Sequence, residues 1–216
     1  MQIVPVINCP DFKTLSKQLG EASGFLHEGG WVHIDVVDGM FSKNITWNNP
    51  AELLNLKSSY PDLNFEIHLM VENPDEFVEI WFMNGASRVI VHLEAVNNPD
   101  YILDIASRCN GEVALSITPS TPADLLLPHV GSFSSFQVLA VEPGFAGQKF
   151  SLESLEKIEF LRNVAPSARI EVDGGINLET ARLAKIAGAD IAASASYIFN
   201  NTNPQKAYEE LNGAVA

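Results

Sequence analysis

The chain has 216 residues, a length that one large β or α/β domain can account for. Hydrophobic residues make up 46% and charged residues 19%, which excludes a disordered chain and favours a large buried core. The 13 Lys and Arg against 27 Asp and Glu give a net charge of -14, which argues against nucleic-acid and membrane partners. A small anionic ligand would therefore have to be held by contacts within its own site.

The cysteine count and the first residues predict a cytoplasmic protein. Cys9 and Cys109 are too few for a disulfide framework and fit a reducing compartment. The segment 1–5 has neither the basic nor the apolar region of a signal peptide. No apolar run approaches the length of a membrane span.

Short runs rich in Val and Ile, bounded by turn residues, predict eight strands. Several of them are apolar on both faces, as expected for parallel strands that helices cover. The predicted strands are residues 3–8, 31–37, 65–70, 88–93, 112–117, 135–141, 169–172 and 190–194.

Longer amphipathic stretches between these runs predict helices. Polar residues such as Asp11 and Asn177 stand where N-caps are expected, and Gly85 and Gly188 follow two of the helices, where a left-handed cap is expected. The predicted helices are residues 12–26, 50–57, 74–83, 99–107, 123–127, 152–163, 178–187 and 204–211.

The strict alternation of strand and helix predicts the architecture. Eight such units in a chain of this length are typical of a (β/α)8 barrel, here a single domain over residues 1–216. The alternative is an open doubly wound sheet, but no G-x-G-x-x-G follows the first strand.

Four polar side chains stand at the ends of three predicted strands, where a barrel places its chemistry. His33 and Asp35 share a strand face, His68 ends the third strand and Asp173 ends the seventh. A single strand histidine is more often a core residue than a ligand. Two imidazoles and two carboxylates at one barrel mouth instead predict a site for one divalent ion, Zn²⁺, Fe²⁺, Mn²⁺ or Co²⁺.

Small residues follow the last three strands. The loop at residues 141–148, the pair Gly174 and Gly175, and the pair Ala195 and Ser196 let backbone N–H groups approach an anion. One such loop can be an ordinary tight turn. Three on neighbouring strands predict a phosphate pocket, which barrels often place after strands 7 and 8.

These motifs resemble the ribulose-phosphate 3-epimerase family over nearly the full length of the chain. The carrying segments are residues 33–39 (HIDVVDG), 67–71 (IHLMV), 92–95 (HLEA), 119–122 (PSTP), 141–150 (VEPGFAGQKF) and 171–176 (EVDGGI). The resemblance implies a metal-dependent isomerase that inverts C3 of a ketose phosphate, D-ribulose 5-phosphate to D-xylulose 5-phosphate, and that forms homo-oligomers.

The resemblance also implies residue roles. Asp35 and Asp173 would transfer protons on opposite faces of an enediolate, and His33 and His68 would complete the metal site with them. The substrate or its phosphate would be bound by Cys9, Gly144, Phe145, Ala146, Gly147, Gly174, Gly175, Ala195 and Ser196.

Several positions depart from the family pattern. Cys9 stands in place of a serine, Met40 in place of a histidine, and Ala146 and Ala195 in place of glycines. These departures leave two alternatives open: a 3-epimerase of a ketohexose 6-phosphate of the allulose type, or a catalytically weak protein that binds sugar phosphates. A hexulose-phosphate synthase shares the barrel, but the expected lysine–aspartate grouping is missing.

His92 and Glu94 share a strand face. The favoured interpretation is a structural polar pair in the barrel interior, and the alternative is a supporting role beside the metal site.

Overall fold

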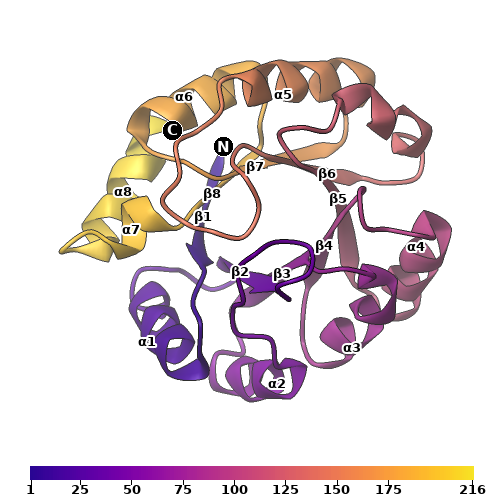
Figure 1. Cartoon of the computed structure of the whole chain (residues 1–216). Coiled ribbons are helices and arrows are strands. Elements are labelled where there is room, and N and C mark those ends of the chain that lie inside the picture. The colour runs from indigo at the N-terminus through magenta and orange to yellow at the C-terminus, as the bar shows by residue number, and fades with distance from the viewer.

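The computed structural model describes all residues 1–216 and confirms the predicted barrel. Eight parallel strands pair in chain order and close into a barrel, with β8 beside β1, and helices surround the strands (Figure 1). The strands are β1 (Gln2–Ile7), β2 (Trp31–Val37), β3 (Asn64–Met70), β4 (Arg88–His92), β5 (Glu112–Ile117), β6 (Ser135–Leu139), β7 (Arg169–Asp173) and β8 (Ile191–Ser194). Each predicted strand is present, with its ends shifted by at most two residues.

The helices follow the predicted alternation. Asp11, Asn98, Asn177 and Asn203 cap helices through their side chains, and Gly188 ends one helix with a φ of 108°. The helices are α1 (Phe12–Ser23), α2 (Pro50–Ser59), α3 (Val78–Met83), α4 (Pro99–Arg108), α5 (Glu153–Val164), α6 (Leu178–Ala187), α7 (Ser196–Phe199) and α8 (Pro204–Ala214).

Two connections differ from the prediction and one helix was missed. The predicted helix 74–83 is a 3-10 turn, η1 (Pro74–Glu76), followed by α3. The segment between β5 and β6 is a 3-10 helix, η2 (Ala123–His129), which extends two residues beyond the prediction and contains Pro128, a residue that cannot continue an α-helix. The short α7 was not predicted, since four residues carry too little periodicity to be recognised.

The strands separate two buried layers. A cluster of 51 apolar residues fills the space between the barrel and the helices, and it includes Val32, Ile34 and Val36 of β2. The alternate residues His33 and Asp35 face the barrel interior, because side chains alternate along a strand. The interior therefore carries the polar groups from which the site is built.

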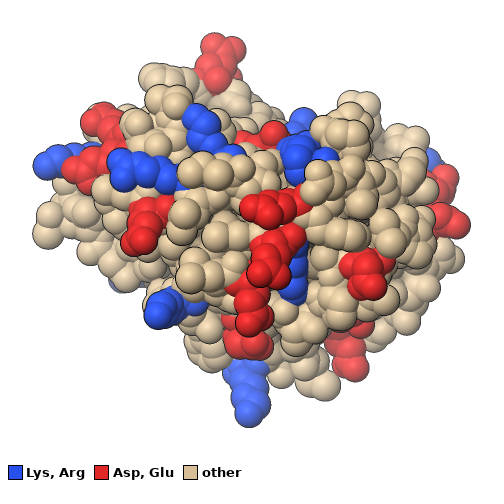
Figure 2. All heavy atoms as spheres, turned by 90° about the horizontal axis from the view of Figure 1, so that it is seen from above, with Lys and Arg blue, Asp and Glu red and all other residues tan.

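The surface agrees with the acidic composition. Figure 2 shows acidic and basic side chains interspersed on the face that it presents, with no basic patch. None of the helices combines the length and the apolar character that crossing a bilayer requires.

Candidate active site

The four predicted metal ligands lie together at the mouth of the barrel. Their candidate ligand atoms, from β2, β3 and β7, all lie within 4.8 Å of one another. Oδ1 of Asp35 is 3.1 Å from Nε2 of His33 and 3.2 Å from Nδ1 of His68. Nδ1 of His68 is in turn 3.6 Å from Oδ2 of Asp173. All four residues are buried, so the cluster is a closed group of two imidazoles and two carboxylates.

A second buried group, formed by Glu66, Arg88 and Glu171, contacts His33 at its ring nitrogen Nδ1. Nδ1 of His33 lies 2.7 Å from Oε1 of Glu66 and 3.4 Å from Oε1 of Glu171. Arg88 donates to Glu66, lies 3.8 Å from Glu171, and stacks over Trp31 with its guanidinium 4.3 Å from the ring centroid. Because Arg88 supplies a positive charge among these carboxylates, this group is an ion-pair network rather than a second metal site.

The pKa values of the cluster follow from burial and pairing. Burial opposes ionisation of Asp35, but hydrogen bonds from His33 and His68 outweigh it and lower the pKa of Asp35. Burial likewise opposes protonation of His33, yet contacts with Asp35, Glu171 and Glu66 raise its pKa well above the usual value. Without a metal, these contacts therefore favour the protonated imidazole of His33 and the ionised carboxylate of Asp35.

His68 also contacts a third imidazole. Its Nε2 lies 2.9 Å from Nε2 of His92, whose pKa is lowered mainly by burial. Beyond His92 lies Glu94, which accepts hydrogen bonds from Thr118 N and from the Thr121 hydroxyl. Burial opposes ionisation of Glu94, but the contacts with His92, Thr118 and Thr121 lower its pKa to about 2. His92 thus contacts the metal-type cluster, the group formed by His33, Asp35, His68 and Asp173, rather than lying apart from it.

The lowered pKa of Glu94 predicts an acid-dependent loss of stability. The unfolded chain protonates this carboxyl near pH 4.5 and the folded protein only near pH 2. The stabilisation is therefore complete above pH 4.5 and is lost as the pH falls toward 2. Above pH 4.5, we expect the free energy of unfolding of the wild type to exceed that of Glu94→Gln by about 1–2 kcal/mol, after allowance for the partial exposure of Glu94. Urea denaturation over this pH range measures the difference, and a difference that does not shrink with acid contradicts the prediction.

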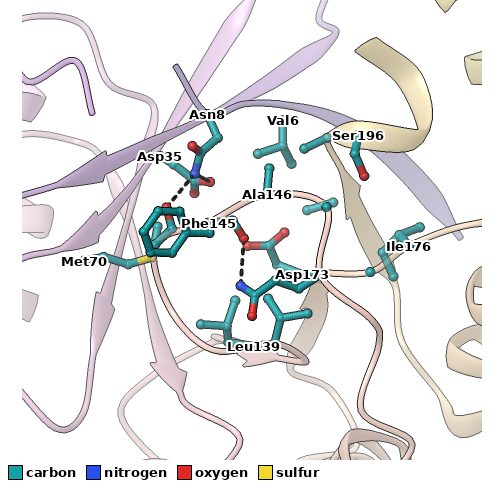
Figure 3. Close-up of a pocket in the computed structure, with 18 residues that line it drawn as sticks. Val6, Asn8, Asp35, Met70, Leu139, Phe145, Ala146, Asp173, Ile176 and Ser196 are labelled. Carbon is teal, nitrogen blue, oxygen red and sulfur yellow. Dashed lines mark hydrogen bonds between the residues drawn. The ribbon is translucent and has the colours of Figure 1, made fainter. Parts of the chain in front are cut away.

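A pocket lies above the cluster at the carboxyl ends of the strands, as predicted (Figure 3). In Figure 3 the side chains of Asp35 and Asp173 point toward its centre, with Asn8 beside Asp35. His33 and His68 do not line the pocket and lie beneath its floor. The lining residues are Val6, Asn8, Asp35, Met70, Leu139, Val141, Gly144, Phe145, Ala146, Gly147, Gln148, Asp173, Gly174, Gly175, Ile176, Ala193, Ala195 and Ser196.

Asn8 is the main pocket residue that sequence reasoning missed. Its carboxamide donates to Oδ2 of Asp35 at 2.8 Å and to the carbonyl of Gly144 at 3.3 Å. The signal was available, because Asn8 follows the first strand in the same way that Asp173 ends the seventh. Inspecting the end of every strand, rather than of three, would have found it.

Cys9 and Met40, two departures from the family pattern, lie outside the pocket lining. Cys9 is buried in the apolar layer, its thiol donates to the carbonyl of Asp11 at 3.4 Å, and burial raises its pKa to about 11. Met40 is 72% exposed. The geometry gives no support to a contact between Cys9 and substrate.

The two alanines in the loops fit without strain. Ala195 has a φ of -96°, and Ala146 is not among the residues with positive φ. Gly144 and Gly147 carry the positive φ values of that loop, 103° and 80°. Since an alanine is costly only at positive φ, the chain keeps glycine where the backbone requires it.

Gly175 is the position where an added methyl group is expected to do the most damage. Its φ is 67°, and a Cβ there would lie 2.4 Å from the backbone N of Phe150. Gly147 has a similar φ of 80° but open space around it. We expect Gly175→Ala to lower the melting temperature and weaken binding of a phosphorylated ligand more than Gly147→Ala does. Calorimetry and titration with the ligand measure both, and equal effects would contradict a steric cause.

Two side chains hold the loop 141–148 in place over the pocket. Oγ of Ser42 donates to the carbonyl of Pro143 at 2.7 Å, and Nδ2 of Asn44 donates to the carbonyl of Gly144 at 2.6 Å. The loop after β2 thus fastens the loop after β6, which places backbone N–H groups near the pocket.

The fold and the site together define a barrel enzyme with a metal-type donor set beneath a glycine-rich pocket. The model of the ribulose-phosphate 3 epimerase family matches residues 2–199, and the chain belongs to this family. It is accordingly an isomerase of the epimerase type. The family and the enzyme class predicted from the motifs are thus confirmed.

Named relatives cover most of the chain. It is 40% identical over 189 residues to the ribulose-phosphate 3-epimerase of Chlamydia muridarum, covering 84% of this chain and 82% of that protein. It is 32% identical over 216 residues to the ribulose-phosphate 3-epimerase of Schizosaccharomyces pombe, covering 99% of this chain and 93% of that protein. The 3-hexulose-6-phosphate synthase from Salmonella typhimurium is similar in fold alone, with a TM-score of 0.77 at 15% identity over 100% and 98% of the two chains.

Proposed function

We propose that the protein interconverts D-ribulose 5-phosphate and D-xylulose 5-phosphate by transferring protons between two aspartates and C3. The observation that carries this proposal is the convergence of Asp35 and Asp173, from β2 and β7, in one pocket above two buried imidazoles. Two relatives, matched over 84% and 99% of this chain, bear the name of this activity, which supports the substrate.

A divalent ion held by His33, Asp35, His68 and Asp173 completes the proposed site. The donor set fits such an ion, because the imidazole nitrogens of His33 and His68 and the carboxylate oxygens converge within 4.8 Å. Mixed nitrogen and oxygen donors suit Zn²⁺, Fe²⁺, Mn²⁺ or Co²⁺. When bound, the ion polarises the substrate carbonyl and stabilises the negative charge that develops there.

The two carboxylates perform the proton transfers. A proton beside a ketone is weakly acidic, and inversion needs one acid/base group on each face of the planar enediolate. We assign Asp35 to one face and Asp173 to the other. Asn8 donates to Asp35, and the pKa of Asp35 is lowered by its imidazole partners, so this carboxylate is held in its ionised form in the metal-free protein.

Backbone groups hold the phosphate in this proposal. Gly144, Gly147, Gly174 and Gly175 line the pocket at positive φ, and Ser196 lies at the start of the short α7 after β8. Barrels commonly bind phosphate with the loops after strands 7 and 8 and the start of a short extra helix. No Lys or Arg lines the pocket, so the acidic net charge does not oppose this mode of binding.

The pentulose phosphate is favoured over a ketohexose 6-phosphate. Cys9 and Met40 suggested a changed sugar site, but neither lines the pocket.

Incubation with ribulose 5-phosphate and Zn²⁺, Fe²⁺, Mn²⁺ or Co²⁺ in D₂O, followed by NMR at C3, tests the proposal. Deuterium incorporation with formation of xylulose 5-phosphate is expected, and no exchange in a fully metal-loaded protein would overturn it.

The two free cysteines, Cys9 and Cys109, bear on the compartment in which the protein works. Unpaired thiols fit a reducing compartment, so we place the reaction in the cytoplasm.

A further inference from the structure

A line of contacting side chains runs from the buried candidate ligand His68 on β3 through the buried His92 on β4 to the partly exposed Glu94. The rings of His68 and His92 stack with centroids 5.0 Å apart, and their Nε2 atoms are 2.9 Å apart. Nδ1 of His92 faces Oε2 of Glu94 at 3.4 Å, which is long for a hydrogen bond, and has no closer partner. Both imidazoles are 0% exposed, so bulk water does not compete for these nitrogens.

The contact between the two imidazoles constrains where their hydrogens lie. Two facing ring nitrogens attract only when one carries a hydrogen and the other a lone pair. Nδ1 of His68 faces Asp35 at 3.2 Å and Asp173 at 3.6 Å, so it is the nitrogen directed at the candidate metal position. A nitrogen that binds a metal carries no hydrogen. His68 must then carry its hydrogen on Nε2 and donate it to Nε2 of His92, which places the hydrogen of His92 on Nδ1, toward Glu94.

The far end of this line is anchored. Oε1 of Glu94 accepts from Thr118 N at 2.8 Å and from the Thr121 hydroxyl, which leaves Oε2 for His92. Nζ of Lys157 holds the same turn by donating to the carbonyls of Thr118 at 3.0 Å and Thr121 at 2.7 Å. The carboxylate therefore has a defined orientation, set by the turn after β5.

We propose that His92 and Glu94 are positioning residues that fix the tautomer and ring orientation of His68 as a metal ligand. The series of contacts from His68 through His92 to Glu94 is called the relay below. The proposal rests on the metal site proposed above. The other imidazole is held in the same way but directly, since Nδ1 of His33 meets Glu66 at 2.7 Å. Partners of this kind commonly change metal affinity by about 10–100-fold when removed. A purely structural His92–Glu94 pair would support packing and leave metal affinity unchanged.

The direct test is the tautomer of each histidine in the wild-type protein loaded with Zn²⁺. Long-range ¹⁵N–¹H NMR spectra distinguish a hydrogen on Nδ1 from one on Nε2. We expect His68 to be protonated on Nε2 and His92 on Nδ1. A hydrogen on Nε2 of His92 in the Zn²⁺-loaded protein would overturn the relay and leave the epimerase proposal intact. Failure of the wild type to take up Zn²⁺, Fe²⁺, Mn²⁺ or Co²⁺ would overturn the metal site and the relay together.

Variants supply the second test. His92→Phe keeps an aromatic ring but leaves Nε2–H of His68 without an acceptor, whereas His92→Gln places an amide oxygen near the lost nitrogen. We expect His92→Phe to weaken Zn²⁺ binding by about 10–100-fold in competition with a chelator and to shift the visible band of bound Co²⁺. We expect His92→Gln to recover most of that loss.

Val91→Ala is the matched control, because Val91 is the preceding residue on β4, is equally buried, and faces the apolar layer instead. It is expected to lower the melting temperature without changing Zn²⁺ affinity. Folded His92→Phe with wild-type affinity and an unchanged Co²⁺ band would overturn the relay. If His92→Phe does not fold, Glu94→Leu, which removes the acceptor facing Nδ1 of His92, is measured in its place: weakened Zn²⁺ binding supports the relay, and wild-type affinity overturns it.

Discussion

Asp173→Asn is expected to lower epimerisation by about 10²–10⁴-fold, the usual contribution of one general acid or base. The amide keeps the shape of the side chain at the end of β7 but cannot exchange a proton with C3. Asp35 remains, so hydrogen at C3 of one of the two epimers is still expected to exchange with D₂O without inversion. Separate measurement of isotope exchange and of product formation by NMR distinguishes these outcomes.

The metal content must be measured beside the rates, because Asp173 is also a candidate ligand. Asp75→Asn is the matched control: Asp75 lies at the same end of the barrel, in η1, and accepts from the backbone N of Asn97 and Asn98 far from the pocket lining. It is expected to retain turnover. Normal turnover by Asp173→Asn would refute the two-aspartate mechanism.

Arg88→Met is expected to produce the largest loss of stability. Arg88 is 2% exposed and pairs with Glu66, which is 0% exposed, and Glu171 lies within 3.8 Å. Removing the guanidinium leaves buried carboxylates without their cation, and breaking such a group typically costs about 3–5 kcal/mol. Chemical denaturation of the metal-free proteins measures the change in the free energy of unfolding.

Arg108→Met tests whether burial is the cause. Arg108 also pairs with two carboxylates, those of Asp104 and Glu79, but its side chain is 51% exposed. Water screens that pair, so a much smaller loss is expected. The double variant Arg88→Met with Glu66→Gln should regain part of the stability, because it removes one uncompensated charge. Equal losses for Arg88→Met and Arg108→Met would contradict the buried-ion explanation.

Local patterns were sufficient for the barrel and for the metal-type cluster. The spacing of His33 and Asp35 places both on one strand face, and strands of one parallel barrel end at one rim, so His68 and Asp173 had to join them. The same alternation explains where Cys9 differs from its neighbour Asn8: Asn8 lines the pocket, whereas Cys9 lies in the apolar layer. Alternation separates the two residues, but barrel closure decides which of the two strand faces points inward.

The contacts between strands could not be predicted in this way. His68 and His92 are 24 residues apart, and their contact depends on the register of β3 against β4. The grouping of Glu66, Arg88 and Glu171 likewise needs the closed barrel, which brings β7 to the same interior as β3 and β4.

The sequence by itself determined the class of fold, the family and the four groups of the proposed metal site, because these follow from alternation along each strand and from motifs within single loops. The acidic net charge also argued against nucleic-acid partners without reference to the fold. Only the tertiary structure decided which residues line the pocket, that Met40 and Cys9 lie outside it, and that each imidazole of the cluster leads to a carboxylate, His33 directly to Glu66 and His68 through His92 to Glu94. Those relations join strands that are distant in the chain, and their geometry is set by barrel closure and register rather than by local preference.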